Sequence, residues 1–209
     1  APAHFALPRT GLARLPHLMI MASILGFVVV PSSRRSMQQY PVFARDVLGQ
    51  PGEPQTAVAA RNSALVTAQG VGALMAAVAL AALSTSSKRK GRLLMIGQLA
   101  IGAAILSFSF VRVTAPALVL IAVIGWGTVT QLATTNTLIQ LIVPDALRGR
   151  VISSYLWGLQ GVAPFGSLLV GWIVQQWGAP TAALLGGSVF LLSTLAIHLL
   201  TPSLRRIVA

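Results

Sequence analysis

Cysteine is absent from this chain of 209 residues, and acidic residues number only three. A chain without cysteine has no disulfides, no thiolate metal ligands and no thiol redox chemistry. Charged residues of both signs make up 9% of the sequence, whereas an ordinary soluble domain carries roughly 25%. These scarcities exclude a disulfide scaffold and argue against a water-soluble fold.

Histidine is scarce as well. His4, His17 and His198 have no carboxylate or second ligand at the spacing of a catalytic pair or a metal site, and no glycine-rich phosphate motif occurs. His198 falls near the end of the last apolar run, where we expect an interfacial residue rather than a proton relay. We therefore predict that the chain is not an enzyme and holds neither a metal nor a cofactor.

Apolar residues make up 55% of the chain, and the mean hydropathy is +0.80. They form six continuous runs near the roughly 20 residues that a helix needs to cross a bilayer. Continuous rather than alternating runs favour helices over a membrane barrel. The predicted fold is an all-α membrane protein with six transmembrane helices. The spans are residues 17–36, 62–83, 93–111, 117–143, 151–177 and 181–200. The first is the weakest, because polar residues 31–36 interrupt it.

Basic residues are distributed unevenly between the predicted loops. Ten of the fifteen lie in four clusters that are separated from one another by pairs of spans: Arg9 and Arg14; Lys88, Arg89, Lys90 and Arg92; Arg148 and Arg150; Arg205 and Arg206. Cytoplasmic loops retain Lys and Arg, so this pattern places both termini in the cytoplasm. The bases separate lipid-length runs instead of gathering on one solvated face, so we expect a lipid bilayer and no nucleic acid as partner.

Several motifs resemble one transporter family. Residues 144–187 contain RGR and APFGSLLVGW, residues 41–49 read PVFARDVLG, and residues 69–73 read QGVGA. Together they resemble the second half of major facilitator superfamily transporters, in particular the enterobactin exporter-like branch of bacterial drug and siderophore effluxers. The resemblance implies helices seven to twelve, one half of a twelve-helix fold whose halves are related by a pseudo-twofold axis.

The same resemblance implies a domain organisation and a partner. Residues 1–16 are expected to be the remnant of a cytoplasmic linker between halves, residues 17–201 the six-helix bundle, and residues 202–209 a cytoplasmic tail. The expected partner is a missing amino-terminal six-helix half, or a second copy of this chain, in the bacterial plasma (inner) membrane. The sequence does not begin with Met, which also suggests that it continues a longer chain.

Three segments depart from the family pattern. Residues 31–40 insert a polar stretch into the first helix, and residues 49–62 lengthen the next loop. The loop that holds Lys88 to Arg92 lacks the acidic residue found there in the family, so a gating ion pair in that loop is unsupported.

The fourth span is the richest in polar residues. At 100° per residue, Thr128, Gln131 and Thr135 fall on one stripe, with Thr134 at its edge. The resemblance assigns this span to helix ten, which lines the central cavity, so these residues are the predicted contacts of a small organic substrate. The alternative is that the hydroxyls bond only to backbone carbonyls or neighbouring helices.

Glycines and a proline mark the fifth span, and three charges mark the loop before it. Pro164 removes a backbone hydrogen bond and predicts a kink, either static or flexing during transport. The kink and packing residues are Gly161, Pro164, Gly166 and Gly171, and the predicted cytoplasmic gate loop holds Asp145, Arg148 and Arg150. The gate arginines would bind a helix carboxyl end or Asp145; otherwise they anchor topology and contact lipid phosphates.

These patterns predict one function and leave one alternative. The function is export of drug-like or siderophore-like small molecules by a secondary active transporter that uses alternating access. The alternative is a degenerate membrane module that transports nothing and packs with a partner or with itself. No acid falls within a predicted span, so a proton-coupling carboxylate is expected in the other half.

Overall fold

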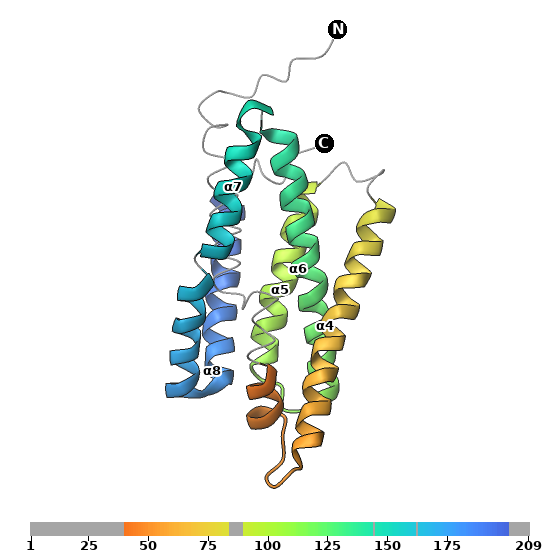
Figure 1. The fold of residues 1–209 in the computed structure, drawn as a ribbon, viewed down its shortest axis with the longest axis vertical. Coiled ribbons are helices and arrows are strands. Elements are labelled where there is room, and N and C mark those ends of the chain that lie inside the picture. The colour runs from red at the N-terminus through yellow and green to blue at the C-terminus, as the bar shows by residue number, and fades with distance from the viewer. Residues whose placement is uncertain (1–39, 84–89, 144, 162, 201–209) are drawn as a thin grey trace.

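A computed structural model of the chain describes residues 40–83, 90–143, 145–161 and 163–200, and every regular element in these residues is a helix (Figure 1). A helical turn at residues 40–42 leads into a five-residue π-helix, η1 (Phe43–Val47). The α-helices that follow are α4 (Gln55–Leu83), α5 (Lys90–Phe108), α6 (Thr114–Ile142), α7 (Asp145–Gly161) and α8 (Ala163–Leu200). The predicted first span lies outside the described residues, as do the linker and the tail.

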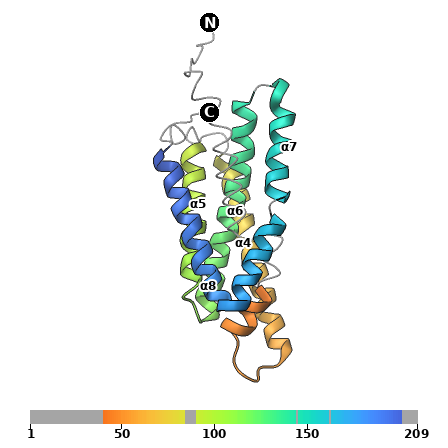
Figure 2. The same cartoon turned by 90° about the vertical axis from the view of Figure 1, so that its left-hand side faces the viewer.

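Four helices in the described residues are long and apolar enough to cross a membrane: α4, α5, α6 and α8. The α8 segment that qualifies, Pro164–Ala196, contains Gly178, whose φ of 83° is a left-handed conformation that glycine adopts without strain. Figure 2 shows α8 turning there into two arms, the first in line with α7. The turn falls between the predicted fifth and sixth spans. Helix α8 therefore consists of two helices joined at Gly178.

Helix α4 begins earlier than the sequence suggested. Residues 55–61 were expected to belong to a lengthened loop, but the structure continues the helix back to Gln55, directly after Pro54. The segment TAVAA that follows Gln55 is rich in alanine, the best helix former, and this local preference extends the helix beyond the apolar run.

Glycines allow the central helices to touch along their backbones. A Cβ atom on Gly72 of α4 would overlap the carbonyl oxygen of Ala122 on α6, and one on Gly125 of α6 would overlap that of Gln69 on α4. Between α5 and α6, a Cβ on Gly97 would lie 3.2 Å from the Thr130 methyl carbon. Small residues at such crossings let helices approach closely without a hydrophobic driving force from water.

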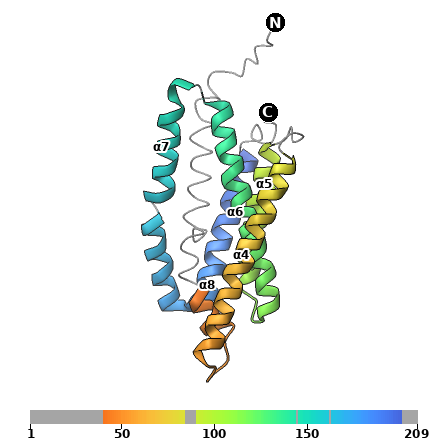
Figure 3. The same cartoon turned by 45° about the vertical axis from the view of Figure 1, so that its right-hand side comes forward.

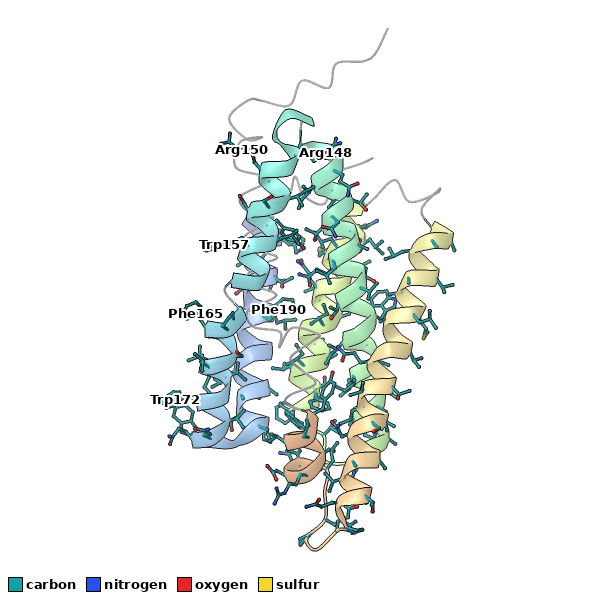
Figure 4. All side chains as sticks on the ribbon, viewed as in Figure 1. Arg148, Arg150, Trp157, Phe165, Trp172 and Phe190 are labelled. Atoms are coloured by element: carbon teal, nitrogen blue, oxygen red, sulfur yellow. The ribbon has the colours of Figure 1, made fainter. Side chains whose placement is uncertain are left out.

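The outward faces of the bundle are apolar, and the central helices are the most buried. Half of the α5 span lies inside the bundle, against 22% of the α4 span. Figure 4 shows Trp157, Phe165 and Trp172 pointing away from the bundle on α7 and the first arm of α8, while Phe190 points inward. Exposed aromatic and aliphatic side chains over this much helix surface fit a lipid environment rather than water.

The two ends of the bundle differ in charge. At one end, which we call the basic end, α4 and α6 terminate, α5 and α7 begin, and Arg92, Arg148 and Arg150 are found (Figures 1 and 4). At the other, which we call the Glu53 end, lie η1 and residues 48–54. The described structure therefore places at opposite ends the loops that the charge pattern assigned to opposite sides of the membrane.

Candidate functional site

The polar residues of α6 lie mostly inside the described bundle. Gln131, Thr134 and Thr135 are 8%, 4% and 0% exposed, and the fully buried Leu138 continues the same side of the helix. Helix α6 packs closely against α4 and α5, so residues on its inner side are removed from lipid. A polar side chain that is buried inside a membrane helix is destabilising unless a hydrogen-bond partner satisfies it.

Two of the α6 threonines are satisfied by their own helix. The hydroxyl of Thr128 donates to the carbonyl oxygen of Ile124 at 2.7 Å, and that of Thr137 donates to Ala133 at 2.9 Å. Such bonds to the preceding turn are the ordinary way in which threonine satisfies its hydroxyl within an apolar helix. Thr128 therefore has the backbone partner that the alternative interpretation expects, and its contact with substrate stays a prediction.

Among the described residues, the hydroxyls of Thr134 and Thr135 have no hydrogen-bond partner, although both are buried. A buried hydroxyl without a partner costs about 1–3 kcal/mol, and a bound polar group recovers that cost. Whether these residues contact substrate stays a prediction, but their chemistry suits such a role.

Tyr155 on α7 shares this property and was not singled out from the sequence. Its side chain is 1% exposed, it packs in a cluster with Ile139 and Val143, and its hydroxyl has no partner. One signal was available: the chain has only two tyrosines, and a tyrosine within an apolar helix must bury a polar tip.

Two buried hydrogen bonds join helices that are distant in the sequence. The hydroxyl of Tyr40, the other tyrosine, donates to the Gln69 side-chain oxygen at 2.9 Å, and a ring nitrogen of His198 lies 3.0 Å from the Gln98 side-chain oxygen. His198 is 3% exposed. It is thus buried between α8 and α5, rather than exposed at an interface as its position in the sequence suggested.

The basic end holds the predicted gate residues. A guanidinium nitrogen of Arg148 donates to the backbone oxygen of Gln140 at 3.1 Å, in the last turn of α6, where a helix carries partial negative charge. Arg150 is exposed on the next turn of α7. Asp145 is the first residue of α7, and its side chain lies outside the described part. The structure thus brings Arg148 to a helix carboxyl end, and a gating role stays a prediction.

At the Glu53 end, charges are paired. Two guanidinium nitrogens of Arg61 bond the two carboxylate oxygens of Glu53 at 2.7 and 3.0 Å, and one also donates to the Ala44 carbonyl oxygen at 2.9 Å. The side chains of Arg61 and Glu53 are 14% and 19% exposed. The Arg61 hydrogen bond, with a second from the Gln50 amide, holds the pKa of Glu53 below its ordinary value of 4.5. Arg61 thereby ties α4 to η1.

The predicted kink residues lie around the boundary of α7 and α8. Helix α7 ends at Gly161, and α8 begins at Ala163, so Pro164 stands in the first turn of a helix, where its missing N–H removes no helical bond. Gly166 is buried, whereas a Cβ on Gly171 would meet no atom within 4 Å. Gly171 thus makes no close helix contact within the described part, and its packing role stays a prediction.

Acidic groups are absent from the buried stretches of the described helices. Asp46 lies in η1 with its side chain 60% exposed, Glu53 precedes α4, and Asp145 opens α7. Across residues 40–83, 90–143, 145–161 and 163–200, no cluster of three His, Cys, Asp or Glu side chains could hold a metal ion. What the interior offers is uncharged hydrogen-bonding groups.

Apolar helices of this length with uncharged polar groups in their interior are typical of a multi-pass membrane protein. The family model described as transmembrane secretion effector matches residues 17–207, nearly the whole chain. The chain therefore belongs to this family of the major facilitator superfamily, and it is a membrane transport protein of the efflux type. No curated protein matches the sequence.

Proposed function

We propose that this chain forms the carboxyl-terminal half of a secondary active exporter and supplies six of its twelve helices. The observation that carries the proposal is the pair of buried hydroxyls without partners, on Thr134 and Thr135, in a chain of the transmembrane secretion effector family. Such groups destabilise a membrane helix unless a polar molecule binds them, and transport requires polar groups of this kind inside the bundle.

The cargo is a drug-like or siderophore-like small organic molecule. It passes between two bundles that rock around a site near the middle of the membrane, so that the site opens to one side at a time. Gln131 and its neighbours on α6 form part of the wall of that site, and Arg148 holds the basic end of α6 in one of the two states. The opposite wall comes from an amino-terminal half or from a second copy of this chain.

The coupling ion is not bound by an acid of this half. Asp46 and Glu53 lie at the Glu53 end and Asp145 at a helix start, whereas a proton-carrying carboxylate belongs within the membrane. We expect proton-driven transport to persist when all three are neutralised in the whole transporter. Loss of the proton dependence of uptake in that triple variant would contradict this assignment.

Transport is tested with vesicles that contain the purified chain, alone and together with a six-helix half encoded upstream of it. We expect substrate movement driven by an imposed ion gradient only when both halves are present, with loss when Gln131 is replaced by Leu. Equal and negligible movement in every preparation would instead support the alternative, a membrane module that packs with a partner or with itself and transports nothing.

The orientation follows from the charge at the two ends. The basic end faces the cytoplasm of a bacterial cell, which places the basic clusters on the side where cytoplasmic loops retain them. Because the chain has no cysteine, each of the variants Gly149→Cys and Gln50→Cys carries one cysteine in this chain for labelling. An impermeant maleimide added to intact cells should label the second variant and not the first. The reverse pattern would overturn the proposed topology.

A further inference from the structure

Two buried hydroxyls lie along the boundary between α6 and α7. Thr135 is 0% exposed and Tyr155 is 1% exposed. Tyr155 belongs to the cluster of Ile139 and Val143, against which Leu132 also packs. Thr135 is three residues after Leu132 and four before Ile139, so it lies on the face of α6 that meets the tyrosine.

Neither hydroxyl has a hydrogen-bond partner in the part of the chain that the structure describes. The contrast with similar residues nearby is sharp: Tyr40 bonds Gln69, and Thr137 bonds the backbone of its own helix. The chain therefore provides partners for a buried tyrosine and for a neighbouring threonine, and leaves these two hydroxyls without one. Both can donate and accept a hydrogen bond.

The chemistry of the pair selects its ligand. The cluster around Tyr155 consists of aliphatic side chains, so an ionised group placed there would lose its hydration without gaining a counter-charge. A hydroxyl or amide costs less to bury and can donate to, or accept from, a threonine or tyrosine hydroxyl. Resting on the proposed function, we infer that Thr135 and Tyr155 form a subsite for the uncharged hydroxyl- or amide-bearing part of the transported molecule.

The position of the pair suits an early contact with cargo. At 1.5 Å per residue, Thr135 lies about 10 Å from the end of α6, and Tyr155 lies about 15 Å from the start of α7. Both distances are measured from the basic end, where α6 ends and α7 begins. Figure 3 shows these two helices meeting there. Cargo that enters from the basic end reaches this pair before the middle of the bundle.

The test uses Thr135→Val and Tyr155→Phe, which remove the hydroxyls and keep the shapes, with Thr137→Val as the matched control. Two radiolabelled probes are bound at equilibrium to the protein in lipid nanodiscs: chloramphenicol, which has hydroxyls and an amide and no charge, and tetraphenylphosphonium, which has no hydrogen-bonding group. We expect each test variant to weaken chloramphenicol binding about fivefold to tenfold, as for one lost neutral hydrogen bond. Tetraphenylphosphonium binding should stay unchanged.

Thermal stability gives the second measurement. Removal of a hydroxyl that has no protein partner should leave the unfolding temperature of either test variant equal or higher, whereas Thr137→Val should lower it slightly. A lower unfolding temperature for both test variants would show structural hydrogen bonds and overturn the subsite. Unchanged chloramphenicol binding, or none by the unsubstituted protein, would also overturn it. If the unsubstituted protein binds chloramphenicol through this pair but moves no substrate in vesicles, the proposed function fails and the subsite stands.

Discussion

The basic end and the Glu53 end of the bundle use arginine in opposite ways. Arg61 is largely buried and bonds both carboxylate oxygens of Glu53 and the Ala44 carbonyl. Arg150 is exposed on the first turns of α7, where a Cβ on the neighbouring Gly149 would meet no atom within 4 Å. Arg61 at the Glu53 end holds segments of the fold together, whereas Arg150 at the basic end remains available to the membrane surface. Counting bases alone does not separate these two roles.

Two matched glycine substitutions, one at each end of the bundle, should give the largest difference in stability between the ends. A Cβ on Gly49 would overlap the Arg45 carbonyl oxygen, and backbone cannot rotate away as a side chain does. We expect Gly49→Ala to destabilise the protein by about 1–3 kcal/mol. Gly149→Ala, in the open helical position, should stabilise it by about 0.5–1 kcal/mol.

Both variants are compared with the unsubstituted protein by denaturant or thermal unfolding in detergent. Effects of the same sign and size at the two positions would show that the Glu53 end is packed no more tightly than the basic end.

The second comparison replaces the arginines themselves. Arg61→Gln removes the partner of Glu53 and the donor to Ala44, so we expect a clear fall in the unfolding temperature. Arg150→Gln should leave that temperature unchanged, because an exposed charge contributes little to stability. Protease sensitivity of residues 48–54 should rise only in the first variant. Equal loss of stability in both would refute the division of roles.

Acid should destabilise the Glu53 end and leave the basic end unaffected. We expect this to be the smallest of the three effects on stability. Because Arg61 lowers the Glu53 pKa in the folded protein, the stabilisation is complete above pH 4.5 and is lost as the pH falls through the lowered value. The unfolding temperature should therefore drop below that pH in the unsubstituted protein, and the drop should be smaller in Glu53→Gln. A drop of the same size in that variant would assign the pH dependence to other groups.

Sequence patterns predicted an all-helical membrane fold because apolar length and turn residues are local signals. The turn at Gly178 falls where residues 177–181 separate two apolar runs, and α4, α5 and α6 overlap their predicted spans. The start of α4 was missed because alanine preference, rather than hydropathy, extends that helix to Gln55.

The interior could be predicted only in part. The stripe of Gln131 and Thr135 followed from helical periodicity, and both residues are buried. Thr128 bonds its own helix, whereas Thr135 has no partner among the described residues. This difference depends on side-chain rotamers and on which helix lies opposite each residue. Two further contacts could not be predicted: Tyr40 with Gln69, which are 29 positions apart, and His198 with Gln98, which are 100 apart. Local sequence patterns carry no information about contacts between residues so far apart in the chain.

The backbone contact between α4 and α6 has a mechanical consequence. At Gly72 and Gly125 the two helices are separated only by the van der Waals radii of their main-chain atoms, with no side chain between them to change rotamer. The crossing therefore contains no side chain that could change rotamer to make room, and a shift of α4 along α6 would bring main-chain atoms into overlap. An opening of the bundle would then be carried by other parts of the fold, such as the turn at Gly178, and not by sliding of α4 along α6.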